Sequence, residues 1–268
     1  MRFTRTALLA GLGAVLASAQ APPQPAPPKD GLPPAVTSPA GAAAGGGRRR
    51  PQAPKGPTPR LANGKPDLSG IWNGGGPVGD LAQGLPKGET IPLLPEAEAL
   101  MKSRNSNDDP EANCLPTGVP RIAPYPWRIV QTDTHVFFLF EGNIHTYRQI
   151  FIDGRKHKDD PDPSWFGDSI GKWDGDTLVV DTIGYNDKFW FDFRGHPHTE
   201  KLHTIERYTR TDLGTLVNEV TIDDPGAYSK PFTLKFTAQL RPGEELMEYI
   251  CQENNQDPGH IKGKAGLP

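Results

Sequence analysis

The sequence predicts an all-β protein in which an antiparallel meander of strands closes into a barrel. Three observations support this prediction. Apolar runs of strand length recur along residues 135–251, separated by short turns that contain Gly or Asp. No segment between the runs has the pattern of a crossover helix, so neighbouring strands are expected to pair as hairpins. Several runs alternate apolar and polar residues, as strands do when one face contacts water.

The expected elements begin with an extended entry strand at residues 64–72. A short helix is expected at 95–104, because Pro95 suits the first helical position and the residues after it have high helix propensity. Tight turns are expected at 142–143 and 174–176. The strands expected after the helix cover residues 135–141, 144–152, 170–173, 177–183, 201–210, 216–222, 231–240 and 246–251.

The faces of these strands refine the architecture. Residues 232–240 alternate apolar with polar side chains, so that strand has one wet face. Residues 137–140 and 178–180 are apolar on both faces, and such strands need cover on the outside of a barrel as well as on the inside. The Pro-rich segment 61–126 is available for this cover. We therefore expect a lipocalin-like barrel with an N-terminal wrapping segment, formed by residues 61–257.

The N-terminus has the organisation of a secretory signal peptide. Arg2 and Arg5 precede an apolar run at residues 7–17, and an Ala-Ser-Ala end supplies the small residues that a signal peptidase recognises. Such a short run cannot span the hydrocarbon core of a bilayer, which is about 30 Å thick. We expect a signal peptide at residues 1–19, no membrane span, and a periplasmic or secreted protein.

The composition changes sharply after the leader. Residues 20–60 hold 12 of the 30 Pro residues and no aromatic residue, so we expect a disordered tether. Residues 258–268 are expected to form a flexible tail. Residues 61–268 carry 21 Lys and Arg against 31 Asp and Glu, a net charge of −10. This acidic core argues against nucleic acid as a partner.

Cys114 and Cys251 are the two cysteines of the chain. In an exported protein they meet an oxidising compartment, and two cysteines permit a single pairing. The sequence therefore predicts a structural disulfide between them.

Aromatic and titratable residues are concentrated in the middle of the chain. Residues 125–193 contain 15 of the 22 aromatic residues, and residues 135–203 contain six of the seven His. A pocket for an organic molecule needs this combination, because rings bury the ligand and polar groups orient it. A packed aromatic core with histidines on the surface is the alternative interpretation.

The run at 144–152 supplies the candidate catalytic residues. One of its faces carries His145 and Tyr147, and the opposite face carries Arg148. We expect the first face to line the lumen, with His145 as general base and Tyr147 as acid. Arg207 is then a better candidate than Arg148 to stabilise developing negative charge, since Arg148 points the other way on an ideal strand.

The candidate ligand-binding residues are aromatic or polar and lie in the same part of the chain. They are Phe151, Trp165, Trp173, Asp181, Asn186, Trp190 and His203. The acidic loop at residues 157–162 lacks the spacing of an EF-hand, which favours a solvated loop over a calcium site.

His196 and His198 are candidate metal ligands. A His-x-His unit on one strand places two imidazoles on the same face, an arrangement that suits zinc, copper or iron. The unit resembles the first motif of the cupins, although Leu202 or His203 stands where that motif has Glu. A Gly and a Pro beside the two His favour a loop at this point. A metal ion is therefore kept as an alternative, and no other cofactor is expected.

Three short blocks resemble the motifs of the SGNH esterases. They lie at residues 167–170, 184–187 and 257–260, and Ser169 occupies the position of the nucleophile. That family is α/β and has helices between its blocks, whereas a hairpin is expected between the first two blocks here.

A wider resemblance covers about residues 64–257. It rests on the segments at 64–72 and 111–118 and on the stretch from His145 to Tyr208. These segments resemble a group of exported, uncharacterised proteins of Gram-negative soil bacteria. The resemblance implies a periplasmic setting and assigns no activity to any residue.

The leading functional hypothesis is a periplasmic barrel that encloses a small, partly aromatic organic molecule. It would perform acid and base chemistry on that molecule without a cofactor, as an isomerase, a lyase or a hydrolase. A carrier with the same pocket and no chemistry is one alternative, because both functions draw on the same residue types. A metal-dependent enzyme that uses His196, His198 and His203 is the other alternative.

Overall fold

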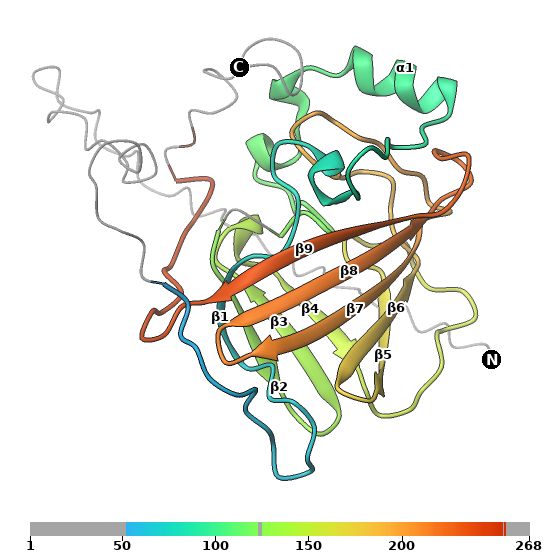
Figure 1. Ribbon diagram of the computed structural model, residues 1–268. Helices are drawn as coiled ribbons and strands as arrows, with labels where there is room; N and C mark the ends of the chain where they lie inside the picture. The colour runs from blue at the N-terminus through green and yellow to red at the C-terminus, as the bar shows by residue number, and fades with distance from the viewer. Residues whose placement is uncertain (1–51, 123–124, 254, 256–268) are drawn as a thin grey trace, which may run out of the picture. The chain divides into compact units, whose positions relative to one another are not determined.

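Nine strands wind in chain order into a closed barrel, in which β1 pairs with β9 (Figure 1). The structure is a computed structural model, and it describes residues 52–122, 125–253 and 255. The predicted all-β barrel is confirmed. Its strands are β1 Gly70–Gly74, β2 Trp127–Gln131, β3 His135–Phe140, β4 Tyr147–Phe151, β5 Asp168–Asp174, β6 Thr177–Ile183, β7 His203–Asp212, β8 Thr215–Asp223 and β9 Phe232–Leu240.

Eight of the nine strand pairings are antiparallel, as predicted, but β4 and β5 are parallel. The expectation of a purely antiparallel meander is wrong at this seam, because the connection at residues 152–167 returns to the end of the barrel where β4 begins. The seam is short, with Ile150 opposite Ser169 and Phe151 opposite Ile170. The first half of β4 therefore lies beside residues 164–167 without strand pairing between them.

Gly167 immediately precedes β5, and its backbone conformation fixes the direction in which the strand begins. Its φ is +64°, and a Cβ at this position would lie 2.5 Å from the carbonyl oxygen of Ile183 on β6. Glycine is required here because a side chain would meet both a strained backbone and a close neighbour.

The lumen contains a hydrophobic core at one end of the barrel. Trp72, Trp127, Phe138 and Leu178 are at its centre, each at most 1% exposed. Phe138 packs on Trp127 with 5.0 Å between ring centroids. Residues of β7, β8 and β9 alternate between buried and exposed positions, which is the predicted pattern of strands with one wet face.

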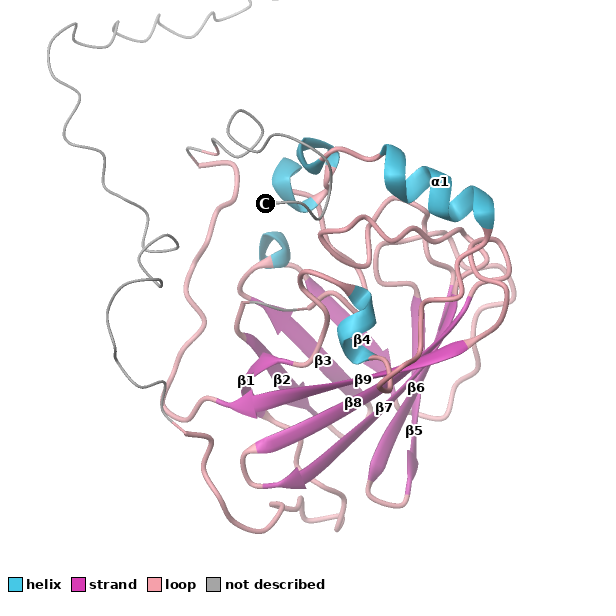
Figure 2. Ribbon diagram, turned by 45° about the horizontal axis from the view of Figure 1, so that its top comes forward, coloured by secondary structure: helices cyan, strands magenta, loops and turns pink. Residues whose placement is uncertain are grey.

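A second hydrophobic cluster fills the other end of the barrel. Val220 of β8 and Leu234 of β9 contribute to it from the inward faces of their strands, together with Leu81, Phe189 and Phe191 from segments outside the barrel. Helix α1 Pro95–Ser103 and the 3₁₀ helix at Leu81–Gly84 lie at this end (Figures 1 and 2). The N-terminal segment thus closes one mouth of the barrel and leaves Phe137 and Leu139, on the outer face of β3, half-buried.

Two of the local predictions are corrected. Residues 144–146 do not belong to β4, because Ile144 and His145 have positive φ values of 55° and 53° and form a turn after β3. Residues 246–251 form no strand. They belong to a C-terminal strap, residues 241–253, which runs along the barrel (red in Figure 1). The helix prediction at 95–104 is confirmed, and β2 is a strand that the sequence did not indicate.

The packed part of the chain begins before the predicted boundary at residue 61. Leu213 N–H donates to the Gly56 carbonyl at 2.9 Å, and the Thr58 hydroxyl donates to the Arg210 carbonyl at 2.9 Å. The described end of the predicted tether is therefore ordered against the β7–β8 turn. The predicted signal peptide, the rest of the tether and the predicted tail lie outside the described residues.

A disulfide joins Cys114 to Cys251, as predicted, and it ties the strap to the segment before β2. The strap is also held by Met247 N–H, which donates to Glu141 Oε2 at 2.9 Å, and by Tyr249, which stacks on Tyr125. In the part of the chain that the structure describes, no helix has the length and hydrophobicity that a membrane-spanning helix needs.

We expect the double substitution Cys114→Ser with Cys251→Ser to lower the free energy of unfolding by about 2–4 kcal/mol. The reason is that the unfolded chain gains conformational entropy when the disulfide no longer closes a loop in it. Urea unfolding followed by far-UV circular dichroism measures this change. An unchanged midpoint would contradict a stabilising role for the disulfide.

Candidate functional site

A cavity of about 580 Å³ opens at the β4–β5 seam, where the two strands are not laddered. Four of the predicted site residues line it, namely His145, Tyr147, Phe151 and Trp165. The other lining residues important to its chemistry are Arg148, Lys158, Phe166, Asp168 and Ser169. The structure therefore gathers aromatic rings and charged groups in one place, which is the composition of a site for a small organic molecule.

The prediction that His145 and Tyr147 face the lumen is wrong. Tyr147 is 61% exposed and lies on the outer face of the barrel, whereas Arg148 is 1% exposed and points inward. The strand is the reverse of the prediction because Arg148 has a buried carboxylate partner, Glu206, on the inner side of the barrel. His145 sits at the turn before β4, where its Nε2 accepts the Tyr249 N–H at 2.9 Å and lies 2.8 Å from the Met247 carbonyl oxygen. Both residues thus form the rim of the cavity.

Arg148 and Ser169 are among the residues that line the cavity, and each is only 1% exposed. Its Nε donates to Ser169 Oγ at 3.2 Å, and its Nη2 donates to Thr182 Oγ1 at 2.9 Å. Glu206 of β7 is fully buried, and its Oε2 lies 2.5 Å from Arg148 Nη2. Burial acts to lower the pKa of Arg148, but the Glu206 carboxylate outweighs this and raises the pKa above its usual value. Arg148 is therefore a permanent cation inside the barrel.

The polar cluster continues across the lumen to β8. The Tyr208 hydroxyl donates to Glu206 Oε1 at 2.6 Å, and Asn218 Nδ2 lies 3.4 Å from the same hydroxyl oxygen. Burial raises the pKa of Tyr208 well above its usual range and raises that of the neighbouring Tyr185 to about 12. Both phenols are therefore neutral at pH 7. We name Arg148, Glu206, Tyr208 and Asn218 the luminal cluster.

Three atoms of the luminal cluster have no hydrogen-bond partner among the described residues, and one of them, Glu206 Oε2, still forms the ion pair with Arg148. No hydrogen-bond acceptor among the described residues contacts Arg148 Nη1, and no donor among them contacts Asn218 Oδ1, although both side chains are buried. Buried groups of this kind are uncommon in folded proteins, since an unmade hydrogen bond in the interior is costly. The sequence signal for this cluster is the inward alternation of β7, where Glu206 and Tyr208 share a face.

A second polar group lies beside the cavity. Asp168, which lines the cavity, contacts His157 Nδ1 at 2.9 Å, and Asp181 Oδ1 lies 3.2 Å from His157 Nε2 and 2.8 Å from His203 Nε2. The predicted site residues Asp181 and His203 are thus connected to the cavity through His157 and Asp168. His157 comes from the acidic loop at residues 157–162, which was expected to be a solvated loop.

The remaining predicted residues lie elsewhere. Arg207 is on the outer face of the barrel and pairs with Asp174 at 2.8 Å, since the inward face of β7 belongs to Glu206 and Tyr208. Trp173 packs partly against the luminal core. Other predicted residues lie at the closed mouth: Trp190 is covered by Arg104, and Asn186 accepts the Lys188 N–H. None of these side chains lines the cavity at the seam.

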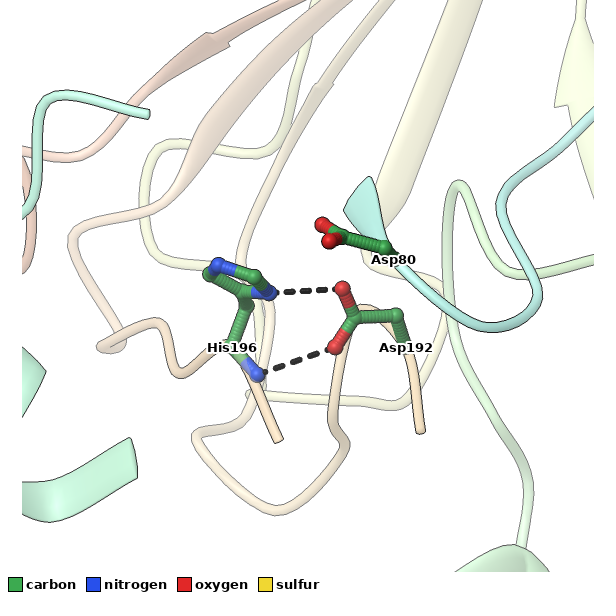
Figure 3. A group of neighbouring side chains, drawn as sticks. All are labelled: Asp80, Asp192 and His196. Carbon is green, nitrogen blue, oxygen red and sulfur yellow. Dashed lines mark hydrogen bonds and ion pairs between the residues drawn. The ribbon is translucent and has the colours of Figure 1, made fainter. Parts of the chain in front are cut away.

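Within the described residues, Asp80, Asp192 and His196 are the group whose side chains approach as metal ligands do (Figure 3). Asp192 accepts the N–H groups of Leu81 and His196, and its Oδ2 lies 2.6 Å from His196 Nδ1. Asp80 pairs with Arg194 at 2.5 Å.

Two more cations act on this group, since Asp192 attracts the charges of both Arg104 and Arg121. Both carboxylates of the group already accept hydrogen bonds, Asp192 from Leu81 and His196 and Asp80 from Arg194. The three side chains therefore act as a clamp that holds residues 192–196 on the segment at 80–82.

The structure separates the predicted metal pair. His198 does not join the clamp but packs against the rings of Phe189 and Phe191, with centroids 3.8 and 5.1 Å away. Burial lowers the pKa of His198 to about 4, so its imidazole is neutral at pH 7.

Ser169 is the residue at the position that resembles the nucleophile of the SGNH esterases. Ser169 is 1% exposed, and its hydroxyl contacts Arg148 and Thr182, with no imidazole among the contacts that the structure shows for it. Ser169 thus lacks the adjacent base that activates a serine.

No protein-family model matches this chain, and no curated protein and no solved structure gives a match. A function for this protein therefore follows from its own site geometry.

Replacing Arg148 by Met is expected to lower the free energy of unfolding by about 3–5 kcal/mol, because Glu206 is then buried without a partner. Glu206→Leu is expected to cost a similar amount for the converse reason. The double variant is expected to lose less than either single variant. Urea unfolding of the four proteins forms a double-mutant cycle, and additive losses would contradict the pairing.

His198 is expected to make stability depend on pH. Its pKa of about 4 in the folded protein lies below the unfolded value of about 6.5, so the unfolded chain binds more protons between these values. Its contribution is complete above about pH 6.5 and is lost as the pH falls towards 4. Between pH 7 and pH 5 the wild type is expected to lose about 2 kcal/mol more than His198→Phe, as measured by urea unfolding. Equal losses would refute this role.

Proposed function

We propose that this protein is an exported small-molecule-binding protein whose ligand occupies the cavity at the β4–β5 seam. The observation that carries the proposal is that one cavity gathers the aromatic side chains of Phe151, Trp165 and Phe166 with the charged residues Lys158 and Asp168. A volume of about 580 Å³ lies within the range of small-molecule sites.

The walls suit a flat apolar molecule. Phe151, Trp165 and Phe166 line the cavity, and the Phe166 ring stacks on Phe140 of the barrel with 5.5 Å between centroids. Phe151 is likewise backed, since Arg155 covers its ring at 3.7 Å. Rings that are already held lose little conformational entropy when a ligand binds, so this wall is preorganised.

The Cys114–Cys251 disulfide supports a location outside the cytoplasm, because such bonds persist in oxidising compartments. The signal-like leader points to the same location, in the periplasm or the medium.

Acid and base chemistry on the bound molecule is a second candidate function. Asp168 faces the cavity and is oriented by His157 Nδ1 and by the Lys158 N–H at 3.2 Å. An oriented carboxylate in an aromatic pocket is a competent general base. It is better placed than His145, whose Nε2 is engaged by the strap. Asp168→Asn would then abolish turnover of a bound ligand and retain its binding, whereas unchanged turnover would exclude this role.

Prodan, a neutral naphthyl ketone with solvent-sensitive fluorescence, tests the binding function. We expect its emission to shift to the blue with the wild-type protein, and Trp165→Ala to weaken binding at least tenfold because a wall of the cavity is removed. Trp173→Ala is the matched control, since Trp173 does not line the cavity. Absence of a shift with the folded wild type, or equal weakening in both variants, would contradict the proposal.

A further inference from the structure

A second cavity, of about 410 Å³, lies between the strap and the barrel. Its walls are mainly aliphatic, with Leu139 on β3 and both Leu246 and Met247 on the strap. Met247 is 64% exposed, so apolar surface in this cavity is open to solvent. We name it the strap cavity, and we name the cavity at the β4–β5 seam the seam cavity. Apolar side chains that are exposed together in a concave surface are typical of a binding groove.

The two cavities adjoin at Tyr147. His145, Thr146 and Tyr147 line both of them. Tyr147 is 61% exposed on the outer face of β4, opposite Leu139 of β3 in the strand register. Phe151, two positions further along the same face of β4, lines the seam cavity. Both cavities therefore lie next to each other along the outer face of β4, where one ligand can contact both.

The strap wall is held in place before a ligand binds. The disulfide fixes one end of the strap, and Met247 N–H donates to Glu141 Oε2 at 2.9 Å. Tyr249 N–H donates to His145 Nε2 at 2.9 Å, and His145 lines both cavities. This last bond therefore fixes the strap at the point where the cavities meet. A groove whose wall is already formed loses little conformational entropy on binding.

The linings of the two cavities suit different parts of a molecule. Trp165 and Phe166 offer the seam cavity flat aromatic surfaces, on which a ring can stack. The Leu and Met side chains of the strap cavity suit a flexible alkyl chain, because the unbranched thioether of Met adapts to irregular shapes. A chain attached to a ring in the seam cavity would enter the strap cavity directly past Tyr147.

We propose that the two cavities form one bipartite site for an alkyl-substituted aromatic molecule, with its ring in the seam cavity and its chain in the strap cavity. This inference rests on the proposed binding function and specifies its ligand class. The chain is uncharged, since Glu248 also lines the strap cavity and would repel an anionic end. The exposure of Met247, which packing does not explain, then has a role in ligand binding.

Prodan and its hexanoyl homologue test this inference. They carry the same naphthyl chromophore, and the acyl chain of the homologue is three methylene groups longer. Each buried methylene tightens binding about fourfold, so full burial of three would give an advantage of about 60-fold. The strap cavity is partly open, and we therefore expect the homologue to bind the wild type at least tenfold more tightly than Prodan. Titrations followed by the blue shift of the emission give the two dissociation constants.

Met247→Asp removes an apolar wall of the strap cavity and places a charge in it, so we expect the advantage of the homologue to fall below threefold. The strap contacts at this residue use its backbone N–H and carbonyl groups, which the substitution retains. Leu100→Asp is the matched control, because Leu100 is 47% exposed on α1 and lines neither cavity. It is expected to leave the affinity ratio within twofold of the wild-type value.

The inference is overturned if the advantage of the homologue is below tenfold with the wild type. It is also overturned if a folded Met247→Asp protein keeps the wild-type ratio, or if Leu100→Asp loses that ratio to the same extent. The wild-type pair alone can overturn it, even if Met247→Asp does not fold. Failure of Prodan itself to bind would instead overturn the proposed binding function.

Discussion

The ion pair between Arg148 and Glu206 is the interaction on which the interior of this barrel depends. Both side chains are buried, on strands β4 and β7, and neither charge is tolerable in the lumen without the other. The pair also explains the polar residues around it, because Ser169, Thr182 and Tyr208 form hydrogen bonds with Arg148 Nε, Arg148 Nη2 and Glu206 Oε1 respectively.

The parallel seam between β4 and β5 opens the cavity beside this pair. The two strands share only two registered pairs, and residues 164–167 line the cavity next to the unpaired part of β4. The same connection places Trp165 and Phe166 as a wall and Asp168 at the rim, so one irregular segment builds most of the site.

Local patterns predicted the features that depend on neighbours in sequence. The alternation along residues 232–240, the helix that begins at Pro95 and the pairing of the two cysteines were all predictable. Features set by distant partners were not. Arg148 looked solvent-exposed because its partner lies on β7, and the parallel pairing of β5 depends on the path of a long connection. Four of the predicted site residues, His145, Tyr147, Phe151 and Trp165, line the seam cavity, but the face of β4 was assigned inversely.

We propose that the cavity at the β4–β5 seam binds a small aromatic molecule. A crystal structure of the protein with Prodan tests this proposal most directly. We expect the naphthalene ring inside the cavity, in contact with Trp165 and Phe151. Prodan bound elsewhere on the protein, with the cavity free of it, would contradict the proposal.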